Sequence, residues 1–440
     1  MNRRHFLSMP LAAAQRRPLN FLVILADDIG AKELACYGNQ KHRTPNLDAL
    51  ARGGVQFQTC YATPICHPTR VEILTGQYGS RNGVHNFAGR RGGPDENAPV
   101  ENMRNHYTFG RMLKERGYET ALAGKWQLSG TYPDIVRETG FAEYCIWAFE
   151  NYVSPEDRPR YRARERYWEP AIMKNGKLIP TTKDDYGPNI YSDYLADFIR
   201  RKRDRPFLAY YPMALTHGPH VPSPDTVKAD ADKHVASKAN YKGAVEYMDK
   251  IVGKMVKALE DAGVRENTVI LYTGDNGTAG EGKGDPTELG ARVPMIANCP
   301  GLIPARPASP ELMDLSDFFP TLAAFAGAPL PRGKRLDGRS LAGYLRGESP
   351  APREWIHSFI ADRRIFRTKR FLLEDNSPLH WGRLYDCGSS RDGTGYREVT
   401  GSSDPEVKKA RSLFDRLIAD LPVPHEPEEG HPTDKKRAKA

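Results

Sequence analysis

The chain has 440 residues, 39% of them hydrophobic and 27% charged, a composition typical of a globular protein with a sizeable core. Lysine and arginine outnumber aspartate and glutamate by 64 to 55, and the resulting net charge of +9 favours anionic partners. The sequence has no nucleic-acid-binding motif and, beyond its N-terminus, no apolar stretch long enough to cross a membrane, so neither class of protein is expected.

The N-terminus has the order of features that export signals have. Two arginines, Arg3 and Arg4, precede a short apolar stretch, and Ala12-Ala13-Ala14 offers a small-residue cleavage site. We therefore predict that residues 1–17 form a twin-arginine-like export signal and that the mature protein is periplasmic or secreted.

Four apolar runs each end in polar residues. Runs of this length are typical of strands buried on both faces of a sheet, and they lie at Leu19–Ala26, Tyr118–Ala123, Phe207–Leu215 and Thr268–Thr273. The polar residues that follow them are, in order, Asp27-Asp28, Gly124-Lys125, Thr216-His217 and Gly274-Asp275-Asn276. Because ligands of open α/β sheets bind beyond the carboxyl ends of the strands, we expect these four polar groups to meet at one edge.

Amphipathic patterns with helix start and stop signals separate these runs, at Thr44–Gly54, Thr108–Gly117, Tyr241–Ala262 and Leu315–Ala326. The alternation predicts an α/β fold with a large, mostly parallel central sheet flanked by helices, over residues 18–346. Short strand patterns at Arg364–Leu373 and Arg383–Tyr385, then a helical pattern at Pro405–Leu421, predict a small C-terminal α+β domain over residues 347–421. A Pro/Glu/Lys-rich disordered tail is predicted for residues 422–440.

Residues 141–190 are rich in aromatic residues and arginines and show little periodicity. One interpretation is a substrate-facing insertion, in which rings stack on sugars and arginines meet sulfates. The other is an irregular, solvated excursion, and the sequence favours neither.

The six cysteines are scattered, without a Cys-x-x-Cys pair, so the sequence predicts neither a disulfide framework nor a zinc site. We expect mostly buried free thiols at Cys36, Cys60, Cys66, Cys145, Cys299 and Cys387.

The most informative stretch is Cys66-His67-Pro68-Thr69-Arg70, which continues to Leu74-Thr75-Gly76. Pro68 suits the first turn of a helix, so Cys66 is predicted at a helix start, where free N–H groups and the helix dipole hold an anion. Arg70 adds a guanidinium that grips oxyanions. The string C-x-P-x-R-x-x-x-L-T-G resembles the signature of the type I sulfatases, and the resemblance extends over roughly residues 19 to 390.

This resemblance implies an alkaline-phosphatase-like α/β sandwich and a nucleophile made after translation. In the family a maturation enzyme oxidises the cysteine to Cα-formylglycine, whose hydrated aldehyde attacks sulfur and later releases sulfate. The position of that cysteine is Cys66 in this chain. The resemblance also implies one Ca2+ ion, bound by an oxygen of the modified Cys66 together with Asp27, Asp28, Asp275 and Asn276. Paired carboxylates with further oxygens are the donors that hard divalent cations prefer.

Further motifs match the family in their order along the chain. They are Gly124-Lys125-Trp126, Thr216-His217-Gly218-Pro219-His220, and Gly282-Lys283-Gly284 with the following Glu288-Leu289-Gly290-Ala291-Arg292-Val293-Pro294. The resemblance implies that Lys125 and Lys283 bind sulfate oxygens. It also implies that His217, with Lys283, assists the departing alcohol.

One residue departs from the family pattern. After Gly-Lys-Trp the family usually has histidine, a favoured base for regenerating the aldehyde, whereas this chain has Gln127. Glutamine can hydrogen-bond to the hydroxyl of the modified residue, but it cannot take a proton at ordinary pH. The replacement base is either His67 or solvent assisted by a metal-lowered pKa of the diol, and we favour the second because His67 can point away from position 66.

Together these observations predict a sulfuric ester hydrolase whose catalytic residues are Cys66, Arg70, Lys125, Gln127, His217 and Lys283. Export, positive charge and the segment 141–190 favour a sulfated polysaccharide or oligosaccharide as the substrate. Two alternatives stay open: a phosphonate monoester or phosphodiester hydrolase of the same superfamily, and a glycan-binding pseudo-sulfatase that lost its rate through Gln127.

Overall fold

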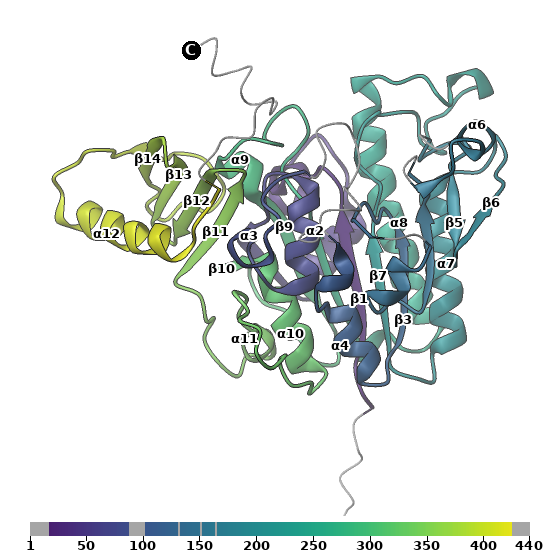
Figure 1. The fold of residues 1–440 in the computed structure, drawn as a ribbon, viewed down its shortest axis with the longest axis horizontal. Coiled ribbons are helices and arrows are strands. Elements are labelled where there is room, and N and C mark those ends of the chain that lie inside the picture. Colours follow the sequence, from purple (N-terminus) through teal and green to yellow (C-terminus); the bar gives the residue numbers. More distant parts are fainter. Residues whose placement is uncertain (1–16, 88–101, 131–132, 150–151, 163–164, 425–440) are drawn as a thin grey trace, which may run out of the picture.

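The computed structural model describes residues 17–87, 102–130, 133–149, 152–162 and 165–424 (Figure 1). The predicted export signal, except for residue 17, and most of the predicted tail lie outside the described residues. Within the described part of the chain, no helix has both the length and the hydrophobicity that crossing a membrane requires.

A ten-stranded sheet forms the centre of the molecule, with the strand order β10-β2-β9-β8-β1-β7-β3-β4-β5-β6. Its strands are β1 (Asn20–Ala26), β2 (Val55–Tyr61), β3 (Glu119–Gly124), β4 (Glu143–Trp147), β5 (Ile172–Lys174), β6 (Lys177–Ile179), β7 (Phe207–Pro212), β8 (Thr268–Gly274), β9 (Arg292–Asn298) and β10 (Ser309–Asp314). The central strands β8, β1, β7, β3 and β4 are parallel neighbours, while β9, β5 and β6 pair antiparallel.

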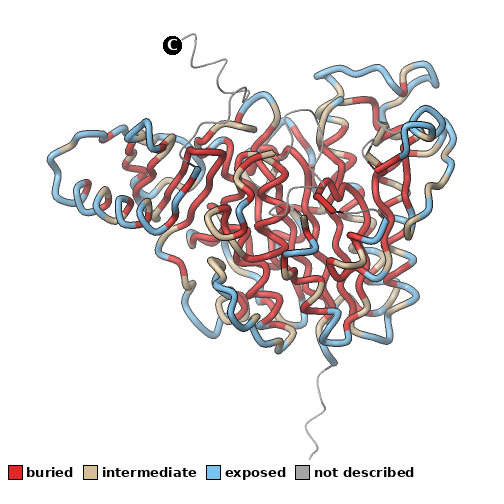
Figure 2. The backbone as a smooth tube through the Cα atoms, viewed as in Figure 1, coloured by how far each residue is buried: buried red, intermediate tan, exposed pale blue. Residues whose placement is uncertain are grey.

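The four apolar runs of the sequence form β1, β3, β7 and β8, which lie side by side. Every residue of β1, β7 and β8 is buried, because helices cover both faces of the sheet there. Figure 2 shows the buried backbone concentrated in this central region. The prediction of a large, mostly parallel sheet flanked by helices is therefore confirmed.

The helices of the described residues are α1 (Pro45–Arg52), α2 (Cys66–Thr75), α3 (Gly79–Asn82), α4 (Phe109–Glu115), α5 (Ile135–Glu138), α6 (Asp157–Arg160), α7 (Gly187–Lys202), α8 (Tyr241–Asp261), α9 (Glu288–Ala291), α10 (Phe318–Phe325), α11 (Ala342–Arg346) and α12 (Pro405–Asp420). One group, α1, α7 and α8, packs together, and a second group, α2, α4 and α10, packs together with the sheet between the two (Figure 1). The second group contains the predicted Cys66 helix.

A separate antiparallel sheet follows the main one. Its order is β11-β12-β13-β14-β15, and its strands are Trp355–Ile360, Arg363–Thr368, Phe371–Ser377, His380–Asp386 and Arg397–Glu398. Helix α12 packs on it through Phe414, whose ring lies 6.1 Å from that of Phe366. The single strand expected at Arg364–Leu373 is wrong in detail, because the chain turns at Lys369-Arg370 and forms the hairpin β12–β13.

The segment 141–190 contains β4, α6, β5 and β6, and the strands extend the main sheet. Several of its aromatic side chains are buried: Tyr144, Trp147, Tyr167 and Trp168 are at most 5% exposed. The strands and buried rings of this segment thus belong to the folded core, whereas residues 154–156 and 158–160 are exposed, so each interpretation describes part of the segment. All six cysteines have free thiols, and all but Cys36 are buried.

Candidate active site

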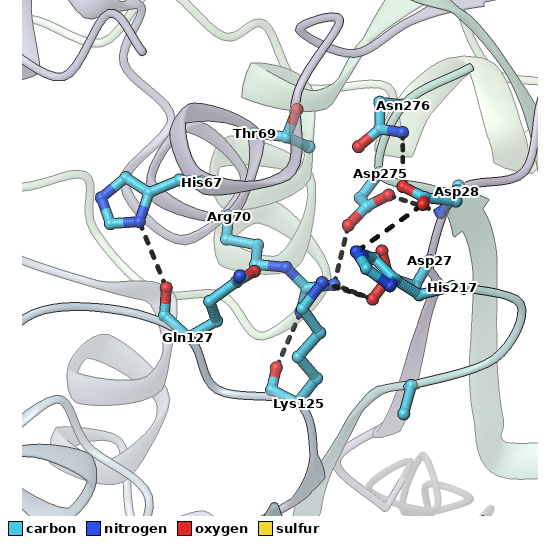
Figure 3. Close-up of polar contacts among 12 residues, drawn as sticks. Asp27, Asp28, His67, Thr69, Arg70, Lys125, Gln127, His217, Asp275 and Asn276 are labelled. Carbon is cyan, nitrogen blue, oxygen red and sulfur yellow. Dashed lines mark hydrogen bonds and ion pairs between the residues drawn. The ribbon is translucent and has the colours of Figure 1, made fainter. Parts of the chain in front are cut away.

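The polar residues after the four central strands meet at one edge of the sheet. The backbone ladder continues past the strand ends, since the Asp275 amide donates to the carbonyl of Ala26 at 2.9 Å and the Thr216 amide to that of Asp27 at 2.6 Å. This pairing brings Asp27, Asp275 and His217 together although they are up to 248 positions apart in the sequence. Figure 3 shows these residues gathered beside helix α2.

Cys66 is the first residue of α2, as Pro68 in the first turn predicts. The Thr69 side chain fixes this helix start, because its Oγ1 lies 3.1 Å from the Thr63 amide and 3.1 Å from the Ile65 carbonyl. Every residue of α2 is buried, and the Cys66 side chain is 3% exposed. Burial raises the pKa of the Cys66 thiol, and the nearby ammonium groups of Lys125 and Lys283 oppose that rise.

Three carboxylates and one amide form a compact acidic cluster. The Asp28 amide donates to Asp275 Oδ1 at 3.0 Å, and Asn276 Nδ2 donates to Asp28 Oδ1 at 2.9 Å. Asp28 holds a left-handed φ of +56°, which aims its backbone and side chain at Asp275 and Asn276. All four side chains are at most 2% exposed.

Three cations face this cluster. Arg70 donates from Nη2 to Asp275 Oδ2 at 2.7 Å and from Nη1 to the Lys125 carbonyl at 2.7 Å. Lys125 Nζ lies 2.5 Å from Asp27 Oδ2, and Lys283 Nζ lies 2.6 Å from Asp28 Oδ1. Three positive charges thus face three buried carboxylates.

Burial and the neighbouring charges shift the pKa of Asp27 and of Asp275. Burial acts to raise the pKa of Asp27, but Lys125, His217 and Arg70 outweigh burial and lower it, so this carboxylate stays ionised. Burial, together with the Asp27 charge, raises the pKa of Asp275, and Arg70 limits the rise. The Arg70 guanidinium keeps its proton, because Asp275 and Asp27 raise its pKa against the effect of burial.

His217 lies at the rim of the cluster. Its Nε2 is 3.7 Å from Asp28 Oδ2, and its Nδ1 is within 2.7 Å of Nη1 of Arg166 and 2.6 Å of the Gly218 carbonyl. Burial, and then the Lys125 charge, lower the pKa of His217 to about 3, so the ring is neutral at ordinary pH. Tyr167 also supports this turn, since its hydroxyl lies 2.9 Å from the Ala214 carbonyl and contacts that of His217.

Gln127 and His67 form the opposite side of the site. The Gln127 backbone carbonyl lies 3.2 Å from Nδ1 of His67, while its side-chain Oε1 is buried and has no hydrogen-bond partner. Gln127 has a left-handed φ of +50°, a conformation that bulky residues seldom adopt. In Figure 3 His67 lies across Arg70 from the acidic cluster, and burial lowers its pKa to about 4.

The donor set of the acidic cluster suits a hard divalent cation. Ligand atoms of Asp27, Asp28 and His217 lie within 4.8 Å of one another. Two oxygens of the cluster, Oδ1 of Asp27 and Oδ1 of Asn276, are buried without any hydrogen-bond partner. A buried carboxylate oxygen without a partner is unfavourable unless a cation or donor reaches it, so the residues present fit a calcium ion.

The structure brings together all the residues that the sequence singled out for this site. Sequence reasoning did not assign an individual role to Arg166, which contacts His217, or to Trp147, on which Arg166 stacks. Both belong to the aromatic and arginine-rich segment, so composition gave a signal for the segment but not for the individual side chains. The catalytic and metal-binding roles assigned to these residues remain predictions.

The chain is similar to known proteins in both sequence and fold. The family model described as Sulfatase matches residues 19–328. N-acetylgalactosamine-6-sulfatase of Canis lupus familiaris is 32% identical over 368 residues, covering 76% of this chain and 67% of that protein. Arylsulfatase A of Homo sapiens is 31% identical over 386 residues, covering 79% and 72%. The solved structure of BT4656 in complex with its substrate D-glucosamine-2-N,6-O-disulfate shares the fold, with a TM-score of 0.73, 21% identity and coverage of 92% and 97%.

Proposed function

Because this chain belongs to the sulfatase family and is a sulfatase, we propose that it hydrolyses sulfate monoesters with a formylglycine nucleophile made from Cys66 and one bound calcium ion. The observation that carries the proposal is the convergence of Arg70, Lys125 and Lys283 on the acidic cluster beside the start of α2. A sulfate ester presents several oxygens that need positive charge, and these preorganised cations meet that need.

Calcium would be held by Asp27, Asp28, Asp275 and Asn276, with an oxygen of the modified residue 66. The partnerless oxygens of Asp27 and Asn276 support this assignment. When bound, the ion supplies positive charge that stabilises negative oxygens of the substrate and of residue 66.

Formylglycine, in its hydrated form, supplies an oxygen nucleophile that an unmodified thiol does not. The start of α2 orients that residue, since Thr69 anchors the preceding loop. Arg70 and Lys125 then bind the sulfate oxygens, and the carboxylates keep both side chains in place. Neutral His217 donates a hydrogen bond from Nε2 to the leaving oxygen, and Lys283 adds a positive charge on that side.

We assign the substrate to the sulfated carbohydrates. The structural relative with a sulfated glucosamine as its substrate supports this class, and so does the net charge of +9. The proposal includes a formylglycine-generating maturation enzyme as a partner, export through residues 1–17, and the domain limits 18–346 and 347–421.

Mass spectrometry of the peptide that contains residue 66 tests the chemistry, with protein made beside a maturation enzyme. We expect formylglycine at that position and sulfate release from 4-nitrophenyl sulfate, with both lost in Cys66→Ala. A thiol at residue 66 in fully active protein would refute the formylglycine route. Turnover of bis(4-nitrophenyl) phosphate or of a 4-nitrophenyl phosphonate faster than that of the sulfate would instead favour the alternative of a phosphonate monoester or phosphodiester hydrolase.

A further inference from the structure

Arg166 is a cation at the rim of the site that has no carboxylate partner among the described residues. Its guanidinium stacks on Trp147 with 4.3 Å between the guanidinium carbon and the ring centroid, and Nη1 lies 2.7 Å from Nδ1 of His217. Trp147 is 2% exposed, so the ring beneath the guanidinium is fixed by the core. The stacking orients the guanidinium plane without using any of its N–H donors.

Most of the N–H donors of Arg166 remain unused within the described residues. Nδ1 of His217 either accepts from Arg166 or donates to the Gly218 carbonyl, because a single ring nitrogen cannot do both. At most one donor of Arg166 is therefore satisfied, and Nε is buried with no acceptor at all. A half-buried guanidinium left in this state is suited to an oxyanion, which accepts two parallel hydrogen bonds from it.

The position of Arg166 says where such an anion would sit. His217 stands between Arg166 and the acidic cluster, with Nε2 toward Asp28 and Nδ1 toward Arg166. In the proposed function His217 contacts the leaving oxygen, so Arg166 lies one side chain away from the bond that breaks. An anion bound there belongs to the sugar that leaves, not to the sulfate that is transferred.

We propose that Arg166 is a specificity-determining residue that binds a second oxyanion, a sulfate or a carboxylate, on the sugar that carries the scissile sulfate. This inference rests on the proposed function and narrows its substrate class to doubly anionic saccharide units. Trp147 positions the guanidinium, and the aromatic and arginine-rich segment thereby contributes to substrate recognition.

The experiment compares matched ligands in the wild type and in Arg166→Met, which removes the charge but keeps the stacked chain. For the sulfate arm, N-acetylgalactosamine 4,6-disulfate is compared with its two monosulfates. For the carboxylate arm, a 2-sulfated hexuronate is compared with the 2-sulfated hexose. Each sugar is measured as a substrate. Each is also measured as a competitive inhibitor of the hydrolysis of 4-nitrophenyl sulfate, a substrate that has no second anionic group.

We expect the wild type to prefer the doubly anionic member of at least one pair, and Arg166→Met to lower that preference on the order of 10- to 100-fold, as expected for lost charge-assisted hydrogen bonds. Turnover of 4-nitrophenyl sulfate should fall less than turnover of the doubly anionic sugar, because both reactions lose the contact of Arg166 with His217 but only the second also loses an anion contact. Arg166→Lys should retain more of the preference than Arg166→Met, because lysine keeps the charge but lacks the paired N–H donors of the guanidinium. The control is Arg160→Met, an exposed arginine of the same segment, which should change nothing.

Two results would overturn the proposal. One is an equal loss on 4-nitrophenyl sulfate and on the doubly anionic sugars in Arg166→Met, which would make Arg166 a support for His217. The other is a wild type that shows no preference within either pair. A wild type with formylglycine but no sulfatase activity would contradict the proposed function instead, and calorimetric binding of the same sugar pairs would then still decide the role of Arg166.

Discussion

The substitution Lys125→Met measures how much the free energy of unfolding depends on the buried ion pair between Lys125 and Asp27. Lys125 and Asp27 are both fully buried, and their charged atoms are 2.5 Å apart. Removing one partner of a buried ion pair destabilises a protein by about 3–5 kcal/mol, since the other charge is left uncompensated. Arg70 Nη2 remains 3.6 Å from Asp27, so we expect the lower end, about 3 kcal/mol, in metal-free protein.

Calcium should reverse most of this loss. If the acidic cluster binds the ion, a divalent charge compensates Asp27 in place of the missing ammonium, and the variant should lose only about 1 kcal/mol in saturating calcium. Guanidinium unfolding of wild type and Lys125→Met, each in EDTA and in calcium, measures the four free energies. Lys257→Met serves as the control, because its 2.8 Å pair with Asp261 is exposed and should contribute about 0–1 kcal/mol.

The same loss of stability in EDTA and in calcium would contradict the reasoning, since calcium would then not lie beside Asp27. A loss below about 1 kcal/mol in EDTA would also contradict it, because the buried carboxylate would have found another partner.

Three further predictions follow from the described contacts. Gln127→His should accelerate the second, sulfate-releasing phase of pre-steady-state bursts and leave the first unchanged, because it adds a base in a left-handed conformation that histidine tolerates; an unchanged second phase would show that the base is not limiting. Burial lowers the pKa of His357 to about 3. Below pH 6.5 the unfolded chain therefore takes up a proton that the folded chain does not, and the free energy of unfolding decreases as the pH is lowered. His357→Gln should therefore lose about 2 kcal/mol less than wild type between pH 7 and pH 5 in guanidinium unfolding, and an equal loss would argue against this linkage. Arg353→Met strands the fully buried Asp314 and Asp317 and should lower stability by about 3–5 kcal/mol, whereas a change under about 1 kcal/mol would show that one acid is already neutral.

Continuous apolar runs made the centre of the fold predictable. β1, β3, β7 and β8 are buried on both faces, so hydrophobicity alone marked them, and their polar ends located the site. The last two strands of the main sheet, β5 and β6, have three residues each, too few to show a periodic pattern among the aromatic residues and arginines around them. The sequence predicts one strand in place of the β12–β13 hairpin, because its turn at Lys369-Arg370 has no glycine or proline to mark it.

The sequence predicted which residues form the site better than it predicted which of them contact one another. The motifs named Lys125, Arg70 and Asp275, but which cation pairs with which acid follows from side-chain packing that no motif encodes. The contact between Arg166 and His217 spans 51 positions and depends on the ring of Trp147 beneath it. Nothing in the local sequence distinguishes Arg166 from the other arginines of its segment.

If Cys66 is oxidised as the proposed function requires, its burial limits when this can happen. An enzyme cannot reach a side chain that is 3% exposed at the start of a wholly buried helix, so the oxidation has to precede folding of this region. The sheet itself leaves time for this, because β1 lies between β7 and β8 and cannot be completed until Gly274 has been synthesised. At the usual pace of synthesis, the 208 residues from 66 to 274 take roughly 10–40 s, a window during which Cys66 stays in an unfinished chain. Under the proposed function, the order of strands along the chain would thus couple the speed of translation to the fraction of molecules in which residue 66 is modified.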